Sequence, residues 1–270
     1  MGQSLATLKR WYNPFRPLVR MLRGEKVLID TSGHCPTCRR DVRFVATHPW
    51  LRDHLRCPNC GSKPRERALM CTLEMFFPNW KEKIIHESSP INRGASVRLA
   101  RECPRYIPSQ LFVDTPLGQE KIGVRCENLE RLTFQDESID LHITQDVMEH
   151  VFNPASVFRE IARTLKPGGA HVFTVPLVNK HRPSQTRAIA GAEGKLTHLL
   201  PPVYHGNPVS SNGALVTVDW GFDICRHIFE ASGLYTHIVH IDDLSHGIRA
   251  EYIEVLVTFK PAGTEAKDAG

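Results

Sequence analysis

The segment "SIDLHITQDVMEHVFNPASVFREIARTLKPGGAHVFTVP", residues 138–176, contains the pattern that determines the fold class of this chain. Its first seven residues have strand character. A helix then begins at Asn153, which can cap it, with Pro154 in the first helical position and apolar residues at helical spacing on one face. The sequence "LKPGG" ends this helix, and "HVFTVPL" follows as a β-rich strand. Strand, helix and strand in this order predict two strands of a parallel sheet.

The same alternation continues on both sides of this segment. Helices are expected at 65–77 and within "WGFDICRHIFEASG" (220–233), where Gly233 marks the end. Further short strands are expected from apolar and β-branched residues at 84–85, 110–114, 123–126, 235–241 and 252–259. The sequence therefore predicts an α/β fold with a mainly parallel sheet and helices on both faces.

The bulk composition is that of a globular protein. Of the 270 residues, 41% are hydrophobic and 23% are charged. No stretch of about 18 apolar residues suggests a transmembrane helix. The N-terminus lacks the continuous apolar region of a secretory signal, so a cytoplasmic location is expected.

Charge is distributed unevenly along the chain. Residues 1–70 contain 14 Lys and Arg against 5 Asp and Glu, a net charge of +9, whereas the whole chain carries +5. A basic arm at 1–30 could therefore meet an anionic partner such as nucleic acid, a phospholipid surface or a phosphorylated substrate. The alternatives are a solvated surface with a disordered lead-in, or a helix that packs on the rest of the fold.

Four of the eight cysteines form two C-x-x-C pairs, Cys35/Cys38 and Cys57/Cys60. This spacing is typical of a four-thiolate zinc site, and four filled positions predict a structural rather than a catalytic ion. A small zinc ribbon is expected over residues 31–66. The alternative is four reduced thiols without a metal. The remaining cysteines are scattered singly and are expected to be core thiols.

The ordered set "NLERLTF", "D-x-S-x-D", "EHV" and "LKPGG" within residues 128–176 resembles the class I S-adenosylmethionine-dependent methyltransferases of the type-11 group. The strong resemblance covers about 50 residues and continues more weakly to about residue 260. It implies a Rossmann-like, seven-stranded, mainly parallel sheet over residues 67–260, with S-adenosylmethionine bound across the carboxyl ends of the strands. A zinc ribbon joined to such a domain recurs in one branch of this group.

The resemblance also implies roles for individual residues. Asn128 matches the residue that faces the adenine amino group, and the Leu129 backbone N–H would contact the ring. Thr144, Gln145 and Asp146 end the fourth strand and would line the methionine end and the methyl group.

The first motif of the family, an apolar strand followed by acid-x-Gly-x-Gly, aligns with "IIHESSP" (84–90). His86 or Glu87 takes the place of the acid, Ser88 that of the first glycine and Pro90 that of the second. Proline is unusual there because it lacks an N–H and fixes φ. Asp114 stands where the ribose-binding acid is expected.

Residues 177–218 form an irregular stretch rich in Pro, Gly and His, which predicts a substrate-side loop. Tyr204, His205 and Trp220 flank it and could cover the substrate, and His150 is a second candidate base. Asp146, His150 and His205 are the catalytic candidates. Residues 261–270 are expected to be a disordered tail.

The sequence thus predicts transfer of a methyl group from S-adenosylmethionine to an oxygen or nitrogen acceptor, with a small molecule or glycan favoured. Two other functions stay open. One is a ribosomal RNA methyltransferase that contacts RNA through the zinc ribbon and basic arm. The other is a scaffold that has lost its cofactor and acts as an interaction module.

Overall fold

The computed structural model describes residues 26–191, 195–206 and 213–263. Residues 1–25 of the predicted basic arm and the tail from residue 264 lie outside this range, so both predictions stay untested. Within the described residues, no helix is long and apolar enough to cross a membrane.

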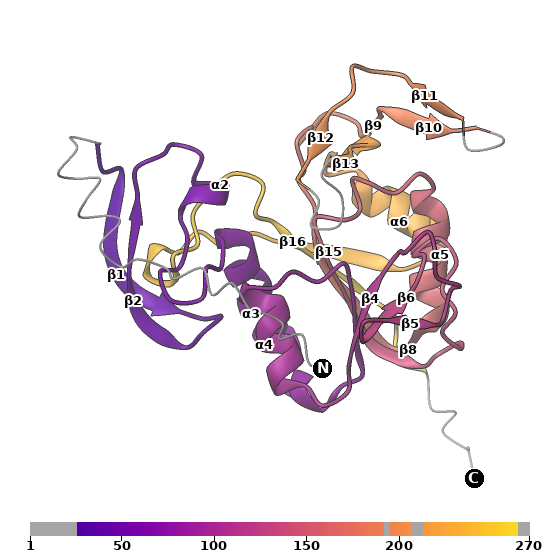
Figure 1. Cartoon of the computed structure of the whole chain (residues 1–270), viewed down its shortest axis with the longest axis horizontal. Helices are drawn as coiled ribbons and strands as arrows, with labels where there is room; N and C mark the ends of the chain where they lie inside the picture. The colour runs from indigo at the N-terminus through magenta and orange to yellow at the C-terminus, as the bar shows by residue number, and fades with distance from the viewer. Residues whose placement is uncertain (1–25, 192–194, 207–212, 264–270) are drawn as a thin grey trace, which may run out of the picture.

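A mixed sheet forms the centre of the molecule (Figure 1). Counted over the described residues it has eight strands, in the order β15-β16-β8-β7-β3-β4-β6-β5. Its parallel part consists of β3 (Ile85–Ser88), β4 (Tyr106–Gln110), β6 (Val124–Cys126), β7 (Ile139–Gln145) and β8 (Leu165–Thr174). Antiparallel strands complete the two edges: β16 (Val255–Phe259) and β15 (Tyr235–Val239) at one, β5 (Glu120–Lys121) at the other.

The Rossmann-like, mainly parallel sheet is confirmed, but the predicted number of seven strands is wrong. The additional strand is β5, which turns back and pairs with β6 over two residues. The strand predicted at 110–114 is also displaced, because β4 occupies Tyr106–Gln110. Pro108 lies inside β4. Because proline is rare within a strand, residues 106–110 were not predicted as one from the sequence.

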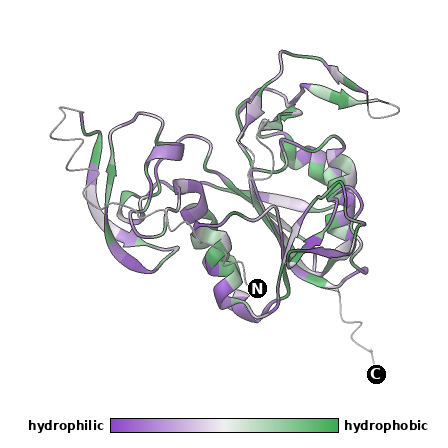
Figure 2. Cartoon of the chain, in the orientation of Figure 1, coloured by the Kyte–Doolittle hydropathy of each residue, from purple (hydrophilic) through white to green (hydrophobic). Residues whose placement is uncertain are grey.

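Helices cover both faces of the sheet, as predicted. On one face lie α3 (Pro64–Phe76), the short η1 (Trp80–Glu82) and α4 (Gly94–Glu102); on the other lie α5 (Pro154–Thr164) and α6 (Ile224–Ser232). Alternate residues of a strand point to opposite faces. Accordingly, Val172 of β8 packs in the cluster of α3, whereas Phe173 packs in the cluster of α5 and α6. Figure 2 shows the hydrophobic residues concentrated along these central elements.

The helix ends follow the signals in the sequence. The Asn153 side chain accepts a hydrogen bond from the Ser156 N–H at 3.1 Å, which caps α5, and Pro154 takes the first helical position. Gly233 ends α6 with a left-handed φ of 72°.

The paired cysteines belong to a small unit, the cysteine module (residues 29–63), at the left of Figure 1. It consists of the hairpin β1 (Ile29–Cys35) and β2 (Arg40–Ala46) and the short helix α2 (Leu51–His54). The module packs against η3 (Leu244–His246), in the connection between β15 and β16. Arg67 of α3 joins the two parts, because its guanidinium donates to the carbonyls of Leu55 and Gly247 at 2.6 and 2.5 Å.

Residues 177–218, predicted as one irregular loop, contain three small antiparallel pairs in their described part, drawn in orange in Figure 1. We call this segment the hairpin insertion. The pairs are β9 (Gln185–Thr186) with β14 (Val218–Asp219), β10 (Ala188–Ala190) with β11 (Leu196–His198), and β12 (Tyr204–His205) with β13 (Ala214–Leu215). Thr217 anchors the insertion, because its N–H donates to the Glu149 carbonyl at 2.7 Å.

Candidate active site

A cavity of about 890 Å³ lies at the carboxyl ends of the parallel strands. Ser89, Gln110 and Gln145 line it from the sheet side. The cysteine module and the start of α3 form another wall, with Trp50, Arg52, Asp53, Lys63, Arg65 and Glu66, and the hairpin insertion contributes His205, Gly206 and Ala214. Ligands of open α/β sheets bind at this edge of the sheet.

Glu87 is the centre of a polar network beneath the cavity. Its carboxylate accepts hydrogen bonds from Ser96 Oγ and Tyr106 Oη, both at 2.6 Å, and from Gln145 Nε2 at 2.7 Å. Complete burial raises the pKa of Glu87, although these hydrogen bonds oppose the effect. The network holds the Gln145 side chain in place. Its Oε1 is buried and has no hydrogen-bond partner among the described residues.

The turn after β3 has the backbone geometry for which glycine is normally used. Ser89 adopts a left-handed φ of 56°, whereas Ser88 is still the last residue of β3. Counted from Glu87, the acid-x-Gly-x-Gly pattern falls on Ser89 and Ile91; counted from His86, it falls on Ser88 and Pro90. Which of the two alignments holds stays a prediction.

Two of the predicted cofactor residues point into the sheet layer. His86 is fully buried, with Nδ1 2.8 Å from His142 Nδ1 and Nε2 2.6 Å from Ser109 Oγ. Burial lowers the pKa of His86 to about 3. Thr144 is also fully buried, with Oγ1 3.0 Å from Nε2 of His171. Neither side chain is among the described residues that line the cavity, and their roles toward a cofactor stay predictions.

Asp146 lies at the end of β7 and is held by two arginines from outside the sheet. Arg52 Nη2 donates to both of its carboxylate oxygens at 2.9 Å, and Arg65 Nε lies 2.6 Å from Oδ2. Burial alone would raise the pKa of Asp146, but the two guanidinium groups outweigh it and lower the pKa to about 2. The backbone of Asp146 is also left-handed, with φ 53°. A carboxylate bound in this way positions other groups more readily than it accepts a proton.

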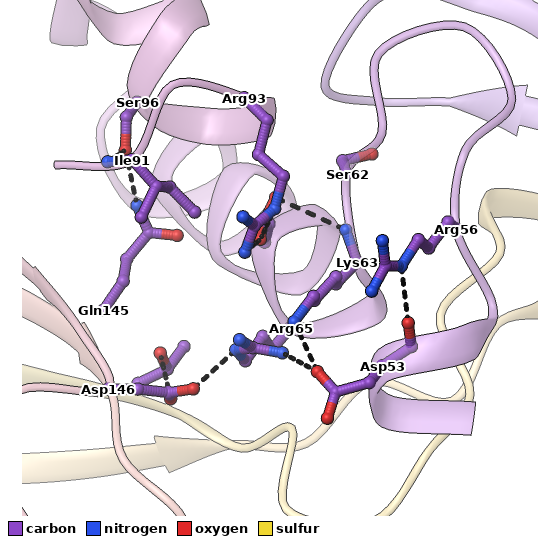
Figure 3. A network of polar contacts seen from close by, with 12 residues as sticks. Asp53, Arg56, Ser62, Lys63, Arg65, Ile91, Arg93, Ser96, Gln145 and Asp146 are labelled. Carbon is purple, nitrogen blue, oxygen red and sulfur yellow. Dashed lines mark hydrogen bonds and ion pairs between the residues drawn. The ribbon is translucent and has the colours of Figure 1, made fainter. Parts of the chain in front are cut away.

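Figure 3 shows how this ion network extends over the wall of the cavity. Arg65 lies between Asp146 and Asp53, and Lys63 is paired with Asp53. Arg93, in the loop before α4, pairs with Glu66 of α3 at 3.1 Å. The cationic side chains of the wall are thus neutralised by neighbouring carboxylates.

The two candidate histidines, His150 from the segment after β7 and His205 from β12 of the hairpin insertion, lie against each other. His150 Nδ1 donates to the Leu215 carbonyl at 2.8 Å, and the rings of His150 and His205 lie edge to face, with centroids 5.2 Å apart. Glu149 lies between them: its Oε1 is 3.7 Å from His150 Nε2 and 3.6 Å from His205 Nδ1. Both histidines line the cavity.

Three predicted cofactor residues lie apart from the residues that line the cavity. Asp114 is four positions beyond the end of β4, with a side chain 63% exposed and paired with Lys121 at 2.5 Å. Asn128 accepts a hydrogen bond from the Glu130 N–H at 2.9 Å, and Leu129 is buried in the core of α5 and α6. Their roles toward a cofactor stay predictions.

The four paired cysteines come together as predicted. Their sulfur atoms all lie within 4.8 Å of one another, and the Cys35–Cys60 and Cys38–Cys57 pairs are each 3.8 Å apart. Four sulfurs about 2.3 Å from a tetrahedral ion would be spaced about 3.8 Å apart.

Several residues of the cavity were missed in the sequence. Gln110 ends β4 at the cavity, and placing the strand at 106–110 would have identified it. Arg52, Lys63 and Arg65 carry no local signal of a site, since they are basic residues in a basic segment, and no pattern around Arg93 marks it either.

The fold is an α/β sheet with a cavity at its carboxyl edge, which is where open α/β sheets bind their ligands. A family model described as "Methyltransferase domain" matches residues 108–173, from within β4 to near the end of β8. This match supports the class expected from the sequence, an S-adenosylmethionine-dependent methyltransferase.

Individual relatives are similar over shorter stretches. The chain is 38% identical to a dimethylglycine N-methyltransferase of Parasynechococcus marenigrum, over 31% of this chain and 34% of that protein. It is 25% identical to a ubiquinone biosynthesis O-methyltransferase of Coxiella burnetii, over 50% of this chain and 56% of the relative. The chain therefore spans between a third and about half of the length of these curated relatives. An S-adenosylmethionine-dependent methyltransferase structure from Mesorhizobium loti aligns with a TM-score of 0.44 and 16% identity, covering 71% of this chain and 97% of that chain.

Proposed function

We propose that this chain transfers a methyl group from S-adenosylmethionine to an oxygen or nitrogen atom of a small-molecule or glycan acceptor. The observation that carries the proposal is the Ser89 turn, which meets the Glu87–Gln145 network at the carboxyl edge of the sheet. The match to a methyltransferase domain over residues 108–173 supports the same conclusion.

The residues around the turn fit the cofactor. The buried Oε1 of Gln145 is an acceptor without a partner among the described residues, and it lies beside the cavity, where a ligand N–H or ammonium group could donate to it. Gln110, at the end of β4, is positioned for the ribose hydroxyls. The turn at Ser89 and Ile91 lines the cavity and would face the methionine part. When bound, S-adenosylmethionine supplies an electrophilic methyl group on a sulfonium that leaves readily.

The acceptor would enter between the cysteine module and the hairpin insertion. Trp50 and Tyr252 on one side and His150 and His205 on another line this part of the cavity. An oxygen or nitrogen lone pair would attack the methyl carbon as the sulfonium–carbon bond breaks; S-adenosylhomocysteine would leave as the neutral thioether, and the acceptor would lose its proton. Positioning supplies much of the rate in such a displacement. His150 and His205 line this part of the cavity and are the candidates for the proton transfer.

We further propose that the cysteine module binds a structural zinc ion through Cys35, Cys38, Cys57 and Cys60. The sulfur spacing of 3.8 Å supports this. The ion would hold Arg52 and the start of α3 in place, and both contribute to the wall of the cavity. Reduced cysteines are also consistent with a cytoplasmic location, which we propose.

The cavity gives less support to an RNA substrate. Among the described residues that line it, Arg52, Lys63, Arg65 and Arg93 are each paired with a carboxylate. A phosphate backbone needs cations that it can neutralise. The anionic partner proposed for the basic arm stays a prediction, because the arm lies outside the described residues.

Calorimetric titration with S-adenosylmethionine and with S-adenosylhomocysteine tests the proposal. Saturable binding of both, abolished or strongly weakened in Gln145→Leu, is the expected result. A folded protein that binds neither would overturn the enzyme interpretation and favour the interaction-module alternative. If binding is found, tritium transfer to RNA compared with transfer to a small-molecule pool decides between the two substrate classes.

A further inference from the structure

Glu149 is a buried carboxylate without a hydrogen bond. The residue is 2% exposed, and both side-chain oxygens lack a hydrogen-bond partner among the described residues. Leaving a charged group in this state costs several kcal/mol, so such a group normally binds a cation or a proton. Its position beside two histidines indicates which cation it could bind.

The two histidines present nitrogens toward this carboxylate. Glu149 Oε1 lies 3.7 Å from His150 Nε2 and 3.6 Å from His205 Nδ1, and the three ligand atoms are all within 4.8 Å of one another. Ligands about 2.1 Å from a common ion and near the tetrahedral angle lie about 3.4 Å apart. The two distances from Glu149 Oε1 to the histidine nitrogens thus need to shorten by only a few tenths of an ångström, and the two histidine nitrogens lie within 4.8 Å of each other.

Hydrogen bonding fixes the tautomer of His150. Its Nδ1–H donates to the Leu215 carbonyl at 2.8 Å, so in the neutral ring Nε2 carries the lone pair that faces Glu149. Metal-binding histidines typically donate their other ring N–H to a carbonyl or carboxylate in this manner. Leu215 belongs to β13, which pairs with β12, the strand of His205, so one hairpin orders both histidines.

We propose that Glu149, His150 and His205 form a second metal site that binds a divalent transition metal such as zinc, iron(II) or cobalt(II). Two imidazoles and one carboxylate suit these ions. His150 and His205 line the cavity, while Glu149 lies behind them, so the open coordination positions face the cavity. The ion would bind an acceptor oxygen there and lower the pKa of the acceptor hydroxyl. This role rests on the proposed function, whereas binding of the ion does not.

The test uses cobalt(II) as the probe and the full-length chain with its cysteines loaded with zinc. Wild type is expected to bind one equivalent of cobalt and to retain its zinc. The spectrum should lack the thiolate charge-transfer absorption that cobalt bound to cysteines would give. His205→Ala and Glu149→Gln are expected to weaken cobalt binding at least tenfold. His198→Ala is the matched control, because His198 is an exposed histidine in the same insertion and is not part of the cluster.

Two results would overturn the proposal. One is that the zinc-loaded wild type takes up no cobalt. The other is that His205→Ala and His198→Ala bind cobalt equally well. Retention of zinc in every variant shows that the module is intact, and binding of S-adenosylmethionine is measured separately. Failure of this site is therefore distinguishable from failure of the proposed function.

Discussion

Arg52 of the cysteine module donates from Nη2 to both carboxylate oxygens of Asp146 at 2.9 Å, across 94 positions of the sequence. Arg52 also donates from Nε to the Tyr252 carbonyl at 2.9 Å. One side chain thus joins the module, the end of β7 and the connection before β16. The N-terminal unit is part of the cavity as well as a neighbour of the sheet.

Replacement of Arg52 tests this connection. Arg52→Ala leaves the buried Asp146 with Arg65 as its remaining guanidinium partner, and we expect a loss of about 1–3 kcal/mol in the free energy of unfolding. We also expect weaker S-adenosylmethionine binding. Urea unfolding and calorimetry measure the two effects. Arg56→Ala is the control, since the side chain of the exposed Arg56 donates to the Asp53 carbonyl within the same module. Equal behaviour of the two variants would refute the coupling.

Ser89 tests the interpretation of the turn. A left-handed conformation costs a non-glycine residue about 1–2 kcal/mol. Ser89→Gly is therefore expected to keep cofactor binding and to raise stability slightly, whereas Ser89→Val is expected to weaken both. Ser88→Gly, in the adjacent strand position, should lower stability instead. Thermal unfolding and calorimetric titration distinguish these outcomes, and loss of binding in Ser89→Gly would contradict the assignment.

Gln110 and Asp114 compete for the role at the end of the second parallel strand. We expect Gln110→Ala to raise the Kd for S-adenosylmethionine by about tenfold, because a lost hydrogen bond costs about 1–1.5 kcal/mol. Once an acceptor is known, the KM for S-adenosylmethionine should rise by the same factor. Asp114→Ala, which removes an exposed ion pair with Lys121, should change it little. A larger effect of Asp114→Ala than of Gln110→Ala would support the assignment of Asp114 made from the sequence.

The zinc proposal predicts the behaviour of the cysteine variants. Metal analysis of the purified chain should find zinc, and Cys57→Ser should lose it together with the native structure of the module. Cys225→Ser replaces a half-buried cysteine of α6 and should retain the metal. Zinc retained by Cys57→Ser at the wild-type level would argue against a four-thiolate site.

The buried histidines predict a specific dependence of stability on pH. Burial lowers the pKa of His86 and of His171 to about 3, below the unfolded value of about 6.5. The unfolded chain therefore binds these protons first as the pH falls. Each histidine should lower the free energy of unfolding by up to about 1.4 kcal/mol per pH unit between about pH 6.5 and 3, with no effect above this range.

His171→Gln isolates one of these contributions. Glutamine can keep the contact with Thr144 Oγ1 without titrating, so the variant should lose less stability than wild type between pH 6 and pH 4. His198→Gln, at an exposed position, should follow wild type. The free energy of unfolding would be measured with urea at each pH. If it fell equally in all three proteins between pH 6 and pH 4, His171 would take up its proton in the folded state as readily as in the unfolded chain.

The parts of the fold that were predictable depend on neighbouring residues. Asn153 and Pro154 set the start of α5 within one turn, and the C-x-x-C spacing brings each pair of sulfurs together within a single turn of chain. Gly233 ends α6 through its own backbone freedom. In each case, a few adjacent side chains and the local backbone decide the geometry. The location of β4 was missed because the local signal of Pro108 opposed the pairing with β3 and β6, which are distant in the sequence.

The sequence by itself determined the fold class, the order of most elements and the clustering of the four cysteines, because periodicity, capping and turn chemistry act over a few residues. Tertiary structure decided the rest. The pairing of Arg52 with Asp146, the left-handed turn at Ser89 and the meeting of Glu149 with His205 depend on segments that are distant in the chain. Tertiary packing brings the ion-pair and hydrogen-bond partners together across such distances, and no periodic pattern in the sequence indicates which residues will meet.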